Sequence, residues 1–362
     1  MIPESQRVPR TLERVDAAWL AGALAERFPN ARVRSVRTLR EHSGTTARRT
    51  LAIEYAAEGE PPGAPRSAFV KVRPPRLTEE LFGRVFALGP TEVAFYRDIR
   101  PGLPVRAPDC YAARMGKGGE FALLLEDLGA SRAVFKTIAD PVSLREAESV
   151  IDSLATLHAA FWRARRFPWL RTAADNPNAA IERFVCSSAH RPTLRRFADL
   201  LPEGVRRGAG RIHAERRALE RYWSDGPLTL IHGDSHIGNM YFVGGQAGFF
   251  DWQVTQHHQG IRDVAYFLIL SLDTELRRAH ERALIGGYRR RLVELGVPVH
   301  DVDENWLWER YRSYSLYAYI ATSVTSAMSD LQPAHIARTG LQRAATAVED
   351  LGALRLLDRI VS

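Results

Sequence analysis

Short apolar runs in the first third of the chain predict a small β-sheet. Residues 31–40 and 50–55 place apolar side chains between polar ones, and residues 67–72 form an apolar run that contains one lysine. Residues 121–128 begin with a continuous apolar run, the pattern of a strand that is buried on both faces. Short runs of this kind are typical of strands. We therefore expect four strands before residue 128.

Apolar residues recur at helical spacing in the rest of the chain. Val150, Leu154, Leu157 and Phe161 lie three or four positions apart and predict a long helix over residues 141–166. Further predicted helices cover residues 189–201, 210–223, 262–272, 275–295, 304–328 and 336–357. A chain of 362 residues is long enough to bury two cores. We expect a domain boundary near Leu128, between residues 1–127 and residues 128–362.

One β-hairpin is predicted inside the helical part. Tyr241, Phe242 and Val243 form a short apolar strand, and a second strand runs through residues 248–250. The pair Gly244-Gly245 between them is typical of a tight hairpin turn. This hairpin would place Asn239 before its first strand and Asp251 after its second strand.

The residues around this hairpin have the order of a phosphoryl-transfer site. The run His232-Gly-Asp-Ser-His-Ile-Gly-Asn239 puts Asn239 five residues after Asp234, the spacing of the Asp and Asn in a kinase catalytic loop. Asp234 would accept a proton from a substrate hydroxyl. Asn239 and Asp251 would share the Mg²⁺ of a nucleoside triphosphate, because this ion prefers carboxylate and amide oxygens.

Lys71 is the candidate cation for the phosphates. It lies within the apolar run of residues 67–72, in a chain with 47 arginines and only 3 lysines. A compact ammonium fits between phosphates and a carboxylate better than a wide guanidinium does. A solvent-exposed lysine on an edge strand is the alternative. Glu92, in a helix expected to open at Thr91, would orient Lys71, although an acid in a first helical turn also complements the helix dipole.

Two further segments are candidates for nucleotide contacts. The loop that follows residues 31–40 contains Ser43, Gly44 and Thr45, whose backbone N–H groups and hydroxyls could meet phosphate oxygens. A plain hairpin turn explains this loop nearly as well. At the end of the strand over residues 121–128, Glu126 and Leu128 are where adenine would meet backbone donors and acceptors.

A metallohydrolase is a rival interpretation of the same run. His232, Asp234 and His236 alternate along the chain, and His257 with His258 could complete a metal-ligand cluster. This interpretation leaves Asn239 and the upstream residues without a role.

Taken together, the motifs resemble the aminoglycoside-phosphotransferase branch of the protein-kinase-like superfamily, and more closely its ecdysteroid kinase-like and choline kinase-like relatives. The matching pieces recur in family order over about residues 35–320, and they are Lys71, Glu92, the Leu-Leu-Glu-Asp-Leu segment before residue 129, the segment Ala155-Thr-Leu-His-Ala-Ala-Phe-Trp162, the His232-Gly-Asp loop with Asn239, and Asp251-Trp-Gln. The resemblance implies an α+β, protein-kinase-like bilobal fold. A small antiparallel sheet lobe would bind the nucleotide, and a larger helical lobe would carry the catalytic loop and the acceptor site.

The resemblance also implies a role for each site residue. Asp234 would be the catalytic base, Asn239 and Asp251 the Mg²⁺ ligands, and Lys71 with Glu92 the phosphate clamp. Structural support would come from His232, from His236 and from Asp263, which would accept backbone hydrogen bonds of the catalytic loop. The chain departs from the family at Gln253, where relatives often carry an acid, and in a phosphate loop with a single glycine. We expect the side chains at 71, 234, 239 and 251 to surround one triphosphate.

Charge and cysteine content narrow the choice of partners. The net charge of +8 and the pI near 9.8 suit nucleic-acid binding. However, the arginines are spread along the chain among acidic neighbours, and no basic run exceeds Arg289-Arg-Arg291. We therefore expect no nucleic-acid partner. Two cysteines, no apolar stretch of membrane-spanning length and no signal-peptide pattern favour a protein of the reducing cytoplasm without a membrane segment.

The sequence thus predicts an enzyme, an ATP- and Mg²⁺-dependent kinase that phosphorylates a hydroxyl of a small molecule. The acceptor could be an alcohol, a sugar, a sterol-like molecule or an antibiotic. The aromatic residues of 305–319 could stack on it, although aromatics at helical spacing are more often core. Asp301, Asp303, Glu304 and Glu309 could line a pocket for a polycationic antibiotic. A catalytically weak nucleotide-binding regulator on the same fold is the main alternative function.

Overall fold

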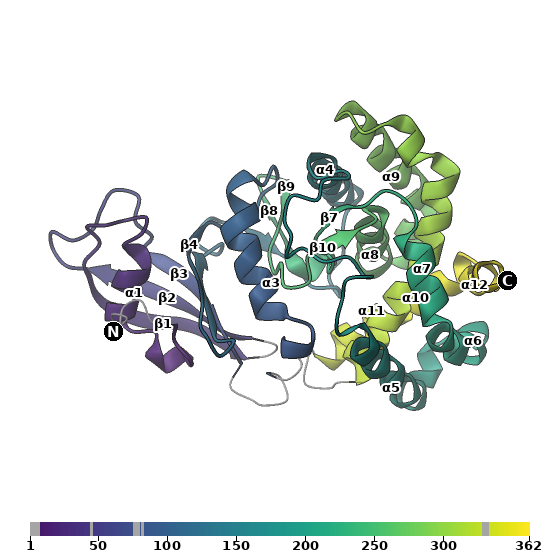
Figure 1. The fold of residues 1–362 in the computed structure, drawn as a ribbon, viewed down its shortest axis with the longest axis horizontal. Helices are drawn as coiled ribbons and strands as arrows, with labels where there is room; N and C mark the ends of the chain where they lie inside the picture. The colour runs from purple at the N-terminus through teal and green to yellow at the C-terminus, as the bar shows by residue number, and fades with distance from the viewer. Residues whose placement is uncertain (1–7, 44–45, 75–79, 81–82, 328–332) are drawn as a thin grey trace. The chain divides into compact units, whose positions relative to one another are not determined.

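The computed structural model of the chain describes residues 8–43, 46–74, 80, 83–327 and 333–362 (Figure 1). The chain divides into two compact units. The first unit consists of the residues up to Leu103, Ala107–Ala133 and the short segment Asp251–Val254. The second unit consists of Pro104–Arg106, Val134–Phe250 and Thr255–Ser362.

The first unit is built on a five-stranded antiparallel sheet. Its strand order is β1-β2-β3-β5-β4. The strands are β1 (Val33–Ser43), β2 (Ala47–Tyr55), β3 (Ser67–Val72), β4 (Cys110–Met115) and β5 (Phe121–Glu126). The four strands predicted from the sequence are confirmed. β4 was not predicted, because polar and charged residues interrupt its apolar positions.

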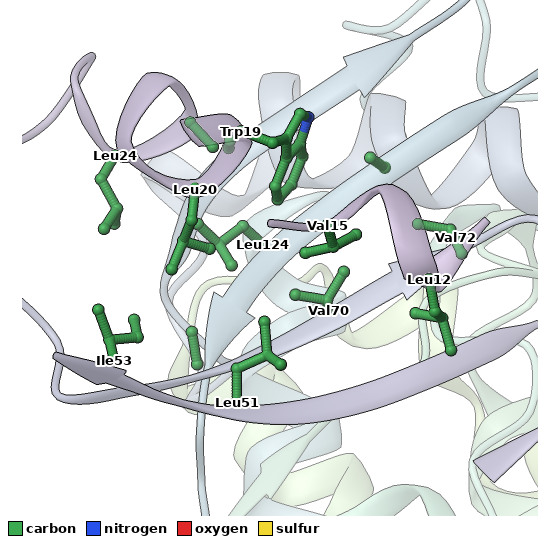
Figure 2. Close-up of a cluster of buried hydrophobic side chains, with 14 of the residues drawn as sticks. Leu12, Val15, Trp19, Leu20, Leu24, Leu51, Ile53, Val70, Val72 and Leu124 are labelled. Carbon is green, nitrogen blue, oxygen red and sulfur yellow. The ribbon is translucent and has the colours of Figure 1, made fainter. Parts of the chain in front are cut away.

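One face of this sheet carries the core of the first unit. Leu51, Val70 and Leu124 come from three different strands and pack with Trp19 and Leu20 of α1 (Ala17–Leu24), as Figure 2 shows. The short 3₁₀ turn η2 (Leu12–Arg14) adds Leu12 to the same cluster. Burial of these apolar side chains holds the helix against the sheet.

Helix α3 (Leu88–Ala94) follows the sheet's first three strands and continues as the π-helical turn η3 (Phe95–Ile99) and the 3₁₀ turn η4 (Arg100–Gly102). We expected this helix to open at Thr91, and that boundary was wrong. The helix starts three residues earlier because Pro90 lies in its first turn, where a missing N–H removes no helical hydrogen bond. Glu92 therefore lies near the end of α3 and not in its first turn.

The second unit contains two small β-structures. Strands β6 (Val134–Phe135), β8 (Met240–Val243) and β9 (Gln246–Phe249) form a sheet of order β6-β8-β9, and β7 (Thr229–Ile231) pairs with β10 (Gln256–His258). The predicted hairpin is confirmed as β8 and β9. Its two turn residues, Gly244 and Gly245, have φ values of 59° and 82°, which glycine adopts without steric cost.

Helices make up most of the second unit. They are α4 (Leu144–Ala160), α5 (Ala179–Phe197), α6 (Glu203–Ala214), α7 (Arg216–Ser224), α8 (Ile261–Ser271), α9 (Thr274–Glu294), α10 (Glu304–Ala327), α11 (Ala334–Asp350) and α12 (Ala353–Val361). Two short 3₁₀ turns, η5 (Ala198–Leu200) and η7 (Val299–Val302), lie between them, and a third, η6 (Ile237–Asn239), precedes β8. The α+β fold class, with an antiparallel sheet in one unit and mostly helices in the other, is confirmed.

Several helix boundaries differ from the prediction. Helix α4 begins after Ser143, whose side chain forms a capping box with Glu146, so the predicted start at residue 141 was too early. Helix α5 begins ten residues before the predicted start, because few of its residues are buried and its apolar pattern is weak. The segments over 210–223 and 336–357 are each two helices, and Gly352 separates α11 from α12 with a φ of 57°.

Candidate active site

Lys71 lies on β3, the middle strand of the five-stranded sheet. Its Nζ lies 2.7 and 2.8 Å from the two carboxylate oxygens of Glu92 and 3.1 Å from Oδ1 of Asp251. Lys71 is 3% exposed and Glu92 is fully buried. The alternative of a solvent-exposed lysine on an edge strand is therefore wrong, and three charged groups of the first unit meet in a largely buried cluster.

Burial has a clear electrostatic effect on Glu92. Loss of water around the carboxylate raises the pKa of Glu92 to about 7, and the charge of Lys71 opposes this rise only in part. The negative charge of Asp251 adds to the rise. Near neutral pH the cluster thus holds a carboxyl group that is close to its protonation midpoint.

Asp251 is held in a strained backbone conformation. Its φ is 67°, in the left-handed region that residues other than glycine seldom adopt. Gln253 donates a hydrogen bond to Oδ1 of Asp251, and a guanidinium nitrogen of Arg48 lies 3.9 Å from Oδ2. The next residue, Trp252, stacks on Phe95 with ring centroids 4.1 Å apart, which fixes the segment within the first unit. Strain of this kind persists at functional sites where the surroundings impose it.

In the second unit, the run from His232 to Asn239 leaves β7 as a loop that Asp263 braces. The carboxylate of Asp263 accepts the backbone N–H of His232 at 2.7 Å and that of Gly233 at 2.9 Å. Its backbone carbonyl accepts the hydroxyl of Ser235 at 2.8 Å. Asp263 is fully buried; although burial opposes ionisation, hydrogen bonding to His158 and to the loop lowers the pKa of Asp263. An ionised carboxylate therefore fixes the start of the loop.

The loop presents Asp234 and holds its side chain in place. Nδ2 of Asn239 donates to Oδ2 of Asp234 at 2.8 Å and to its backbone carbonyl at 2.9 Å. The side chain of Asp234 is 38% exposed, so a ligand can reach it. The hydroxyl of Tyr266 on α8 also bonds Asp234, and burial followed by the charge of Asp234 raises the pKa of Tyr266 well above its ordinary value.

The two histidines of the run support the loop through their ring nitrogens. Nδ1 of His232 accepts the N–H of Asp234 at 3.3 Å, and its Nε2 donates to the carbonyl of Phe250 at 3.0 Å. Nδ1 of His236 accepts the N–H of Gly238 at 3.0 Å and so caps the 3₁₀ turn η6. Both rings are thus engaged within the loop.

His158 on α4 is a supporting residue that the sequence arguments set aside as core. Its Nε2 lies 3.3 Å from Oδ2 of Asp263, and its Nδ1 lies 2.8 Å from the hydroxyl of Tyr288. The Tyr288 hydroxyl can donate to Nδ1 and leave the Nε2 proton for Asp263. Its place in the segment Ala155–Trp162, which carries part of the resemblance, was the available signal.

The donor atoms present fit magnesium. Asn239 uses its Nδ2 to bond Asp234, and no donor among the described residues bonds its Oδ1. An amide oxygen and the carboxylate of Asp251 are hard ligands of the kind that Mg²⁺ prefers. In the part of the chain that the structure describes, no group of three or more His, Cys, Asp or Glu side chains could hold a metal ion. The metallohydrolase interpretation therefore has no ligand cluster there.

The remaining candidates have other surroundings. Gly44 and Thr45 lie outside the described residues, and Ser43 ends β1, paired with Ala47 of β2. The side chain of Glu126 accepts hydrogen bonds from Asp109 N and from the hydroxyl of Ser131, and the carbonyl of Leu128 accepts the N–H groups of Ser131 and Ala133. These contacts leave the adenine role of Glu126 and Leu128 a prediction.

The structure thus brings the site residues together in two groups, one in each unit. Lys71, Glu92 and Asp251 form the group of the first unit, and Asp234, Asn239 and their supporting residues form that of the second. The expectation that one triphosphate is surrounded by both groups stays a prediction. No described helix has the length and apolar character needed to cross a membrane.

Three solved structures illustrate the proteins that this chain is similar to. A choline/ethanolamine kinase family protein from Mesorhizobium loti matches with a TM-score of 0.48 at 12% identity, over 90% of this chain and 92% of that chain. Choline kinase LicA from Streptococcus pneumoniae matches with a TM-score of 0.46 at 13% identity, over 88% and 94%. A thermostable mutant of the aminoglycoside phosphotransferase APH(4)-Ia, in a ternary complex with ADP and hygromycin B, matches with 0.44 at 15%, over 90% and 96%.

Because each of these TM-scores lies below 0.5, the family assignment depends on the sequence alone. No curated protein matches the chain. The sequence profile of the ecdysteroid kinase-like family matches residues 48–297, well over half of the chain, and this range includes every residue of the two groups described above. The chain therefore belongs to the ecdysteroid kinase-like family, a family of small-molecule kinases.

Proposed function

We propose that the protein transfers the γ-phosphate of ATP, in the presence of Mg²⁺, to a hydroxyl group of a small molecule. The observation that carries this proposal is the cluster of Lys71, Glu92 and Asp251. A buried lysine that is shared by two carboxylates, one of them on strained backbone, is poorly explained by stability, because burying charge is costly even when it is paired. The same three groups are those that a kinase needs beside a triphosphate.

The residues of the first unit would act on the nucleotide. Lys71, oriented by Glu92, would bind phosphate oxygens and neutralise part of their charge. Bound Mg²⁺·ATP supplies the phosphoryl group and a further positive charge against it. Asp251 and the amide oxygen of Asn239 would hold that metal ion, in agreement with their donor chemistry.

The loop of the second unit would act on the acceptor. Asp234 would accept the hydrogen bond of the acceptor hydroxyl and take its proton as the phosphoryl group is transferred. Asn239 and Tyr266 hold the carboxylate of Asp234 in one orientation. Asp263 fixes the backbone from which Asp234 projects. Positioning of this kind supplies much of the rate enhancement in phosphoryl transfer.

Substitution of Asp234 tests this function. Asp234→Asn should abolish transfer while the affinity for Mg²⁺·ATP stays within about twofold, because the general base contributes roughly 10²- to 10⁴-fold to the rate and does not bind nucleotide. The matched control is Asp199→Asn, at an exposed aspartate paired only with Arg338. It should leave both quantities unchanged.

The assay needs an acceptor, which a metabolite screen can supply. Purified protein, ATP and a cell extract are incubated, and mass spectrometry identifies any compound that gains one phosphoryl group. Normal turnover of that compound by Asp234→Asn would refute the assigned role. Tight binding of Mg²⁺·ATP without any phosphorylated product would favour the nucleotide-binding regulator instead.

A further inference from the structure

A group of aromatic and arginine side chains lies beside Asp234 in the second unit. It consists of Arg216 and Trp223 on α7, Arg262 and Tyr266 on α8, and Tyr317 on α10, and we call it the aromatic–arginine cluster. Tyr266 bonds Asp234 directly, and its ring centroid lies 5.7 Å from that of Tyr317. The cluster therefore borders the carboxylate that would receive the acceptor hydroxyl.

Arg262 is the charged centre of this cluster. Its guanidinium carbon lies 4.0 Å from the centroid of the Tyr317 ring. Its Nη2 bonds the Tyr317 hydroxyl and lies 3.4 Å from the carbonyl of Gly233, the residue before Asp234. Its Nε is buried and has no hydrogen-bond partner in the described part of the chain. Only one of its three nitrogens is thus hydrogen-bonded.

Arg262 differs from the other buried arginines of the described residues. Arg277 pairs with Glu281 and Asp350, Arg310 pairs with Asp225, and Arg343 pairs with Asp273. Arg262, which is 6% exposed, has no carboxylate within ion-pair distance among those residues. A buried guanidinium without a carboxylate is unfavourable unless a ligand supplies the missing negative charge.

The acidic residues that could have lined a pocket for a cationic acceptor are engaged elsewhere. Asp301 accepts hydrogen bonds from Trp162 and Arg163. Asp303 accepts the N–H of Trp306 at the start of α10, and Glu309 accepts the hydroxyl of Tyr222. The aromatic–arginine cluster, in contrast, adds two cations beside Asp234, of which Arg216 is paired with Glu220.

We propose that the acceptor is an alcohol that carries an anionic oxygen group, such as a carboxylate, sulfate or phosphate, and that Arg262 binds this group. The inference rests on the proposed function, because it assigns the chemical class of the acceptor at the same site. The anionic oxygen replaces the neutral hydroxyl of Tyr317 at Nη2, and the half-buried Tyr317 ring contacts the body of the acceptor. A cationic acceptor is repelled by the same guanidinium.

Three matched probes test the proposal: para-(hydroxymethyl)benzoate, its methyl ester, and para-(aminomethyl)benzyl alcohol. They share a ring and a primary hydroxyl and differ in charge. Binding of each probe to the full chain is measured by calorimetry without ATP, and phosphorylation is then measured with Mg²⁺·ATP. We expect the acid to bind roughly ten- to a hundredfold more tightly than the ester, the range for one hydrogen bond between charged groups, and the amine to bind most weakly.

Two variants separate ligand binding from folding. Arg262→Gln keeps a donor for Tyr317 and Gly233 but removes the charge, so acid and ester should bind equally. The ester should keep its affinity and, where it is a substrate, its kcat. Arg310→Gln is the matched control, because Arg310 is also a buried arginine stacked on a tyrosine, at 3.6 Å from Tyr222, but has a carboxylate partner. It should retain the preference for the acid.

The outcomes distinguish this proposal from the proposed function. If the wild-type chain binds the ester or the amine as tightly as the acid, or if Arg262→Gln keeps the preference, the anionic acceptor is refuted whether or not any probe is phosphorylated. If the acid binds through Arg262 and no probe gains a phosphoryl group, the anionic site stands, and the metabolite screen then decides the fate of the kinase function.

Discussion

The buried carboxyl group of Glu92 leads to a prediction about stability and pH. Its pKa is raised from 4.5 to about 7, chiefly by burial. A group whose pKa is higher in the folded state stabilises that state most below its unfolded pKa, and this contribution is lost as the pH rises through the folded pKa. Glu92 should therefore make the folded protein less stable as the pH rises from about 5 to about 8.

The magnitude follows from the two pKa values. At about 1.36 kcal/mol per pKa unit, the rise from 4.5 to about 7 corresponds to roughly 3 kcal/mol in total. Between about pH 5.5 and pH 7.5 the part that is lost is about 2 kcal/mol. No discount for solvent screening applies, because the Glu92 side chain is fully buried.

The test compares the wild-type chain with Glu92→Gln, which keeps the shape but cannot ionise. Unfolding midpoints in urea are measured at several pH values, and the difference between the two proteins isolates Glu92 from all other titrating groups. The variant should gain about 2 kcal/mol relative to the wild type between about pH 5.5 and pH 7.5. The affinity of the wild type for Mg²⁺·ATP should change in the opposite direction and weaken below about pH 7, because a protonated Glu92 orients Lys71 less well.

A difference in stability that stays flat over this interval would refute the argument that burial outweighs Lys71. A difference of opposite sign would show that the ion pair keeps Glu92 ionised well below neutral pH.

Three further changes have expected outcomes. Gly260→Ala would place a Cβ atom 2.7 Å from Nδ1 of His158, so calorimetry should show a loss of about 1–3 kcal/mol. Asp263→Asn removes the charge that accepts two backbone N–H groups of the catalytic loop; kinetics should show kcat reduced at least about tenfold with nucleotide affinity retained. Ser143→Ala breaks the capping box with Glu146 and should cost about 1 kcal/mol, seen as a thermal midpoint lower by roughly 2–4 °C. Unchanged values would contradict each assignment.

Local patterns made part of the fold predictable. The hairpin of β8 and β9 could be read from its Gly244-Gly245 turn, because a two-residue turn with positive φ leaves few other choices. The limits of α8, α9 and α10 differ from the prediction by only a residue or so, because their apolar or polar pattern changes sharply at both ends. The weakly patterned start of α5 and the strand β4 could not be predicted, because packing partners far away in the sequence stabilise them.

The candidate site shows the same division. Spacing alone predicted the pair of Asp234 and Asn239, since both lie on one short loop. The contact of Lys71 with Asp251 joins residues that are 180 positions apart. Only the resemblance to a family proposed it, and only the folded first unit displays it.

By itself, the sequence determined the fold class, the catalytic-loop motif and the type of chemistry, because these depend on local spacing and on the kinds of side chain present. The tertiary structure alone decided which charges remain without a partner. Arg262 is one of 47 arginines, and nothing in its neighbours along the chain sets it apart. It is singled out because folding buries it against Tyr317 and leaves every carboxylate of the described residues beyond ion-pair distance. Pairing of charges depends on contacts between distant segments, which the order of residues does not state.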